Sequence, residues 1–117
     1  MSAAGSDPSV ARRAQLLADR ASEVLDALAR GDLAALDAHF YSSLGRSFAR
    51  VLAENPALAY REAAKVVPEP SVVMLFRAVL RSLGADPEEI EAALEGLRAG
   101  DGSRFLEAAE RALARLH

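Results

Sequence analysis

Apolar residues recur at spacings of three and four along most of the chain, which places them on one face of an α-helix. The first such stretch follows Asp7-Pro8, a capping side chain and a proline at the first helical position, and is expected to end near Arg30. Gly31 is expected to stop this helix. Its apolar positions form a heptad-like seam of Val10, Ala14, Leu17, Ala21, Val24 and Leu28.

A second helix is expected to begin after Asp32 and to kink or split at Gly45, because glycine costs about 1 kcal/mol relative to alanine inside a helix. A third is expected to open at Asn55-Pro56 and to run to about Val66. The inward positions of the second helix would be Leu33, Leu36, Phe40, Leu44, Phe48 and Val51 or Leu52.

The clearest break in the pattern is the proline-rich segment 67–71. The helix expected after it, Val72 to Leu83, closes at Gly84 and is apolar on more than one face, so it should be the central helix of a bundle. A fifth helix is expected to start at Asp86-Pro87, and a last one after the turn at residues 100–103. The pattern therefore predicts an all-α, single-domain bundle of five or six helices over residues 7–117, after a disordered tail of residues 1–6.

Composition supports this class. Hydrophobic residues make up 51% of the chain, largely alanine and leucine, and aromatic residues only 5%. Alanine and leucine lose little entropy in a helix, so the composition favours helices packed closely around small and aliphatic side chains. The longest apolar run, Val72 to Phe76, is far too short to span a membrane.

Charge and cysteine content narrow the possible functions. The net charge of −3 argues against a nucleic-acid footprint over the whole surface, although a local basic patch stays open. The chain contains no cysteine, which excludes disulfides, thiolate metal sites and cysteine nucleophiles. Together with an N-terminus that lacks a secretory pattern, this leads us to expect a cytoplasmic protein.

No residue pattern points to a catalytic or metal-binding centre. The two histidines, His39 and His117, stand far apart in the chain, and neither belongs to a metal-binding pair. The acidic residues from Asp86 to Glu95 open a helix, and carboxylates in a first helical turn complement the helix dipole. The turn Asp101-Gly102-Ser103 lacks the further oxygen ligands of a calcium loop. We therefore expect no cofactor, no metal and no enzymatic activity.

The leading interpretation is a non-enzymatic module for protein interaction or regulation, acting as an adaptor or by oligomerisation. The partner would be another protein or a second copy in a homodimer, and the seam could instead pack into the chain's own core. The candidate contacts are Val10, Leu17, Val24 and Leu28.

Two alternatives stay open. In one, residues 58–83 form a DNA-binding helix-turn-helix, although the two prolines in its turn and its apolar second helix argue against it. Its contacts with nucleic acid would be Arg61, Lys65, Arg77 and Arg81. In the other, a small ligand binds in a pocket lined by His39, Tyr41, Arg46 and Tyr60.

A family resemblance covers about half of the chain, residues 44–97. The matching residues are Leu44-Gly45-Arg46-Ser47, Pro70, Leu75, Leu80, Leu83-Gly84, Ile90-Glu91, Leu94 and Leu97. In these the chain resembles small helical archaeal output domains of the Nitrosopumilus output type. The resemblance implies a regulatory or adaptor role and brings no catalytic residues. The N-terminal helix departs from the family pattern.

Overall fold

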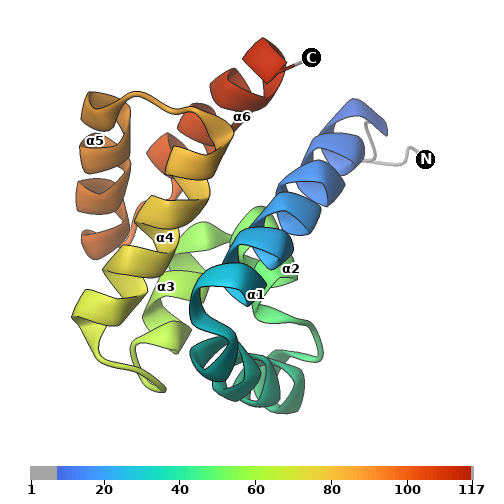
Figure 1. Cartoon of the computed structure of the whole chain (residues 1–117), viewed down its shortest axis with the longest axis vertical. Coiled ribbons are helices and arrows are strands. Elements are labelled where there is room, and N and C mark those ends of the chain that lie inside the picture. Colours follow the sequence, from blue (N-terminus) through green and yellow to red (C-terminus); the bar gives the residue numbers. More distant parts are fainter. Residues whose placement is uncertain (1–7, 117) are drawn as a thin grey trace.

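The computed structural model describes the backbone of residues 8–116 and the side chains of residues 11–116. Within this range the chain forms six α-helices and no strand, which confirms the all-α class (Figure 1). The expected tail, the cap at Asp7 and the side chain of Val10 lie outside the described residues. The helices are α1 (Pro8–Leu44), α2 (Phe48–Glu54), α3 (Pro56–Ala63), α4 (Glu69–Leu83), α5 (Pro87–Arg98) and α6 (Ser103–Leu116).

Helix α1 is longer than predicted and bends sharply near its middle (Figure 1). The backbone leaves helical geometry at Ala29, where φ is −148° and ψ is 56°, and then resumes. Gly31 does not adopt the left-handed conformation that closes a helix, so the predicted stop there is wrong. The helix ends instead at Gly45, whose φ of +72° breaks it where a kink or split was expected.

After Gly45, side chains of neighbouring residues cap the first turns of α2 and α3. The hydroxyl of Ser47 accepts a hydrogen bond from the backbone N–H of Arg50. The side-chain oxygen of Asn55 accepts one from the backbone N–H of Leu58. The Asp37 carboxylate on α1 also accepts one from the N–H of Phe48 at 2.9 Å, which anchors the start of α2 to α1.

Helix α4 begins at Glu69, three residues before the predicted start at Val72. Proline is tolerated in the first turn of a helix, where the missing N–H needs no partner, so Pro70 does not delay the start. The helix closes at Gly84, whose φ is +92°, as the sequence predicted. Helix α5 also begins as predicted, with the Glu89 carboxylate accepting a hydrogen bond from the backbone N–H of Asp86.

The centre of the core is aromatic, whereas composition led us to expect small and aliphatic side chains. Phe76 of α4 makes edge-to-face contacts with Phe48 of α2, Tyr60 of α3 and Phe105 of α6, with ring centroids 5.4 to 5.8 Å apart. Phe40 of α1 belongs to the same aromatic cluster through an edge-to-face contact with Phe48. Leucine, valine and alanine surround this cluster. The predicted central place of α4 is thus confirmed, because its Phe76 contacts side chains from three other helices.

Candidate functional sites

The seam residues of α1 do not share one environment. Leu17 is 3% exposed and belongs to the core, Val24 is half-buried, and Leu28 is 51% exposed. The buried side of the helix runs instead through Leu17, Ala18, Ala21 and Leu25. The first half of α1 therefore packs into its own bundle, and the seam is not one continuous exposed surface.

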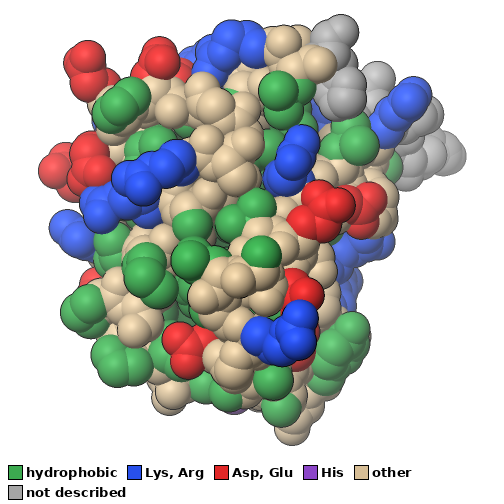
Figure 2. Space-filling view, viewed as in Figure 1, with side chains coloured by type: hydrophobic (Ala, Val, Ile, Leu, Met, Phe, Trp, Pro, Cys, Tyr) green, Lys and Arg blue, Asp and Glu red, His purple; other side chains and the backbone are tan. Residues whose placement is uncertain are grey.

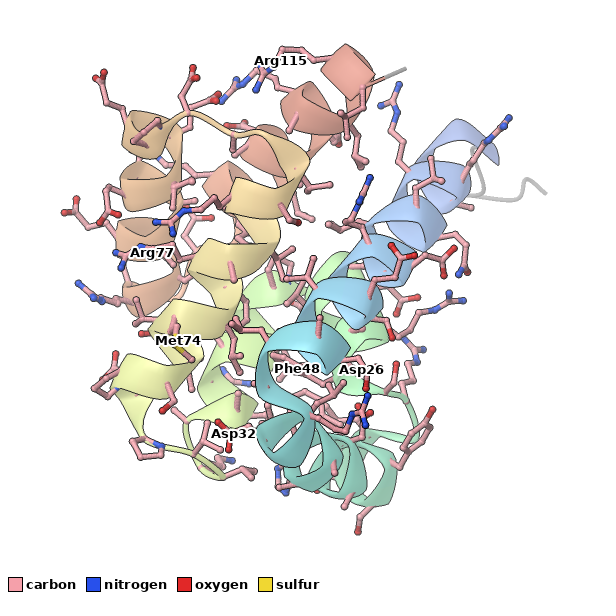
Figure 3. The ribbon with its side chains drawn as sticks, in the orientation of Figure 1. Asp26, Asp32, Phe48, Met74, Arg77 and Arg115 are labelled. Carbon is pink, nitrogen blue, oxygen red and sulfur yellow. The ribbon has the colours of Figure 1, made fainter. Side chains whose placement is uncertain are left out.

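Of the four residues of the helix-turn-helix interpretation, Arg61 lies on α3, Lys65 in the turn after it, and Arg77 and Arg81 on α4; two of the four form ion pairs. Arg77 binds the Glu91 carboxylate of α5 through contacts of 2.8 and 3.1 Å, and Lys65 binds Glu62 at 2.8 Å. Arg61 and Arg81 are exposed. In Figure 3, Arg77 leans from α4 toward α5. On the face that carries α4, Lys and Arg side chains alternate with Asp and Glu around the edges (Figure 2). Seven of the fifteen residues of α4 are buried, so one broad face of this helix packs into the core.

The four residues of the proposed ligand pocket have separate surroundings. His39 lies 3.1 Å from Glu62, Arg46 pairs with Glu54, and Tyr60 donates a hydrogen bond to Glu69 at 2.6 Å. Tyr41 is 59% exposed. Among the described residues, these contacts do not bring the four side chains around one cavity.

An apolar groove of about 270 Å³ lies between the first half of α1, the end of α2 and α6. We call it the α1–α6 groove. Three charged side chains belong to its lining, Arg13 of α1, Glu54 of α2 and Glu110 of α6. The apolar lining consists of Ala11, Ala14, Leu17, Ala53, Leu106, Ala109 and Leu113.

A second hollow lies on the other side of Leu113, where α1 and α6 diverge (Figure 1). Its apolar lining is Leu16, Leu113 and Leu116. Leu116 is 51% exposed although it belongs to the apolar stripe of α6. Three charged residues, Asp19, Arg20 and Glu23, complete the lining of this second hollow.

Polar groups gather at a different place, between α3, the start of α4 and the end of α5. We call this the arginine hollow. It has a volume of about 270 Å³ and adjoins another of about 590 Å³, which Arg77, Pro70 and Val73 help to line. Glu69 and Arg98 line both. The remaining residues of the arginine hollow are Ala57, Tyr60, Arg61, Ala64, Leu97 and Gly100.

The Tyr60 side chain is the buried polar group of this hollow, at 6% exposure for the whole residue. Burial raises the pKa of its phenol, the hydrogen bond to Glu69 raises that pKa further, and the nearby Arg98 guanidinium opposes the change. Sequence reasoning assigned Tyr60 to the ligand-pocket hypothesis, and Arg61 and Arg77 to the helix-turn-helix hypothesis. It missed Glu69 and Arg98, because their proximity depends on how three helices pack.

No protein-family model, curated protein or solved structure matches this chain. The resemblance to archaeal output domains therefore stays a prediction. None of the helices in the described range has an apolar stretch long enough to cross a bilayer. Within the same range, no cluster of histidine and acidic side chains has the arrangement of a metal site.

Proposed function

We propose that this domain is a non-enzymatic protein-interaction module, and that it associates with a second copy of itself through the α1–α6 groove. The observation that carries the proposal is the apolar groove, where Ala11 is exposed and Ala14 and Leu106 are half-buried, together with the half-exposed Leu116 in the hollow beside it. Burying such a surface is favourable by roughly 25 cal/mol per Å² of apolar area.

The lining suits a helix as the docking element. Ala11 and Ala14 of α1 have short side chains, so the backbone of another helix can approach closely. Leu106 and Leu113 provide larger apolar contacts beside them. The exposed end of α6, with Leu116, is a helix of matching chemistry that every copy of the chain carries.

The charged side chains of the lining favour a second copy as the occupant. Arg13 of α1 and Glu110 of α6 both line the groove, whereas Glu54 of α2 is already paired with Arg46 and Arg50. A two-fold axis along the groove would bring Arg13 of one copy to Glu110 of the other. Within one chain, the Arg13–Glu110 contact is long at 3.5 Å and both side chains are more than half exposed, so it can be exchanged at little cost.

The test is molar mass in solution by light scattering over a concentration series. Ala11→Glu places a charge at an exposed position of the groove, and Ala35→Glu makes the same change at an exposed position in the second half of α1. We expect a wild-type dimer, a folded monomer for Ala11→Glu and a dimer for Ala35→Glu. Circular dichroism checks that each variant is folded. A wild type that stays monomeric, or an Ala11→Glu variant that dimerises as well as the control, would overturn the proposal.

A further inference from the structure

The arginine hollow combines three features that the self-association proposal does not use. It is concave, it holds a buried phenol, and two arginines line it from different helices. Arg61 belongs to α3 and Arg98 is the last residue of α5. Among the described residues, neither guanidinium lies within salt-bridge distance of a carboxylate, whereas Arg77 in the adjoining hollow is held by Glu91.

The single carboxylate in the lining is already engaged. The Tyr60 hydroxyl donates to Oε2 of Glu69 at 2.6 Å, and Tyr60 is fixed in turn by its ring contact with Phe76. This hydrogen bond offsets part of the negative charge of Glu69. The lining of the arginine hollow therefore carries two positive charges against one stabilised negative charge, in a chain whose net charge is −3.

The adjoining hollow adds a third arginine, Arg77, whose guanidinium already pairs with Glu91. Apolar side chains lie beside these donors, Leu97 in the arginine hollow and Val73 in the adjoining one, and they offer contact to the carbon part of a ligand.

We propose that the arginine hollow binds a small anionic molecule through its carboxylate or phosphate group, which would be held by Arg61 and Arg98. Guanidinium groups bind both oxyanions through paired N–H donors, so the shared chemistry is a planar or tetrahedral group of acceptor oxygens. The combined size of the two hollows is within the range of small-molecule sites. The body of the ligand would extend toward Val73 and Arg77.

The test is titration of the isotope-labelled protein with inorganic phosphate, and separately with succinate, followed by NMR at constant ionic strength with chloride as the reference anion. We expect saturable shifts at the amides of Tyr60, Arg61 and Arg98. The probe that saturates at the lower concentration identifies phosphate or carboxylate as the preferred group. The proposal would be overturned if neither probe shifts these amides beyond the chloride reference.

Variants with opposite expected effects separate a specific site from general attraction. Arg98→Gln is expected to weaken binding about tenfold or more, because it removes a charge-assisted contact. Glu69→Gln is expected to strengthen binding, because it removes the only negative charge of the lining. Arg81→Gln, the matched control at an exposed arginine outside the hollow, is expected to leave affinity within about twofold. Equal losses for Arg98→Gln and Arg81→Gln, or weaker binding by Glu69→Gln, would refute the site.

Discussion

Nε2 of His39 lies 3.1 Å from Oε1 of Glu62, and Nζ of Lys65 lies 2.8 Å from the other oxygen of the same carboxylate. The contact joins the second half of α1 to α3, and the Glu62 side chain is only 13% exposed. The hydrogen bond from Lys65, followed by that from His39, lowers the pKa of Glu62. Ionised Glu62 therefore helps to hold the half of α1 beyond the bend against the bundle.

A Glu62→Gln substitution should lower stability in a pH-dependent way. Because the pKa of Glu62 is lower in the folded than in the unfolded chain, its contribution is present above the ordinary glutamate pKa of about 4.3 and is lost as the pH falls through the folded value. We expect the variant to be less stable by about 1 kcal/mol at pH 7, a typical value for such contacts. The difference from wild type should shrink toward pH 3.

Urea denaturation at pH 7 and pH 3 measures this difference. Glu107→Gln is the matched control, because Glu107 is an exposed residue of α6. It should change stability little at either pH. A Glu62→Gln penalty that stays the same at pH 3 would show that the charge of Glu62 does not produce it.

Leu25 and Leu28 lie on neighbouring turns of α1, and truncating them should change stability by very different amounts. Leu25 is fully buried, whereas Leu28 is 51% exposed. Leu25→Ala should cost about 2–5 kcal/mol of unfolding free energy through lost burial and a cavity, and Leu28→Ala should stay within about 0.5 kcal/mol. Urea denaturation of both variants under one condition gives the comparison. Similar losses would mean that Leu28 is covered in solution, for example by a partner.

For this pair of leucines, the sequence pattern did not predict which one is buried. The spacing of apolar residues predicted the helix, but Leu25 and Leu28 are both leucines and both fit a helical stripe. Which of them faces the core depends on how α1 packs on its neighbours and on the bend at Ala29. A one-dimensional pattern does not contain that information.

The helix boundaries set by local chemistry were predicted well. Asn55-Pro56, Gly84 and Asp86-Pro87 mark their helix ends as expected, because capping and left-handed closure involve only a few neighbouring residues. Gly31 was misassigned, since a glycine permits a helix stop without requiring one. The arginine hollow was missed as a site because it joins residues of α3, α4 and α5.

Gly102 and Gly31 differ in the space around them, which the sequence pattern did not predict. A Cβ atom added at Gly102 would lie 2.8 Å from Cγ of Pro56 and 3.0 Å from the backbone nitrogen of Ala57, whereas one at Gly31 would meet nothing within 4 Å. Glycine at position 102 thus lets the turn before α6 lie directly against the start of α3. At position 31, inside α1, no such contact needs it.

Gly102→Ala should therefore destabilise the protein by about 1–3 kcal/mol, because the chain must shift to relieve the overlap. Gly31→Ala should stabilise it by about 0.5–1 kcal/mol, because alanine is the better helix former and restricts the unfolded chain. Thermal unfolding of the two variants beside the wild type should show midpoints that move in opposite directions, by about 4 °C or more per kcal/mol. If Gly102→Ala unfolded at the wild-type temperature, the turn before α6 would not press on α3 in solution. If Gly31→Ala were destabilised, the bend in α1 would need glycine two residues after Ala29.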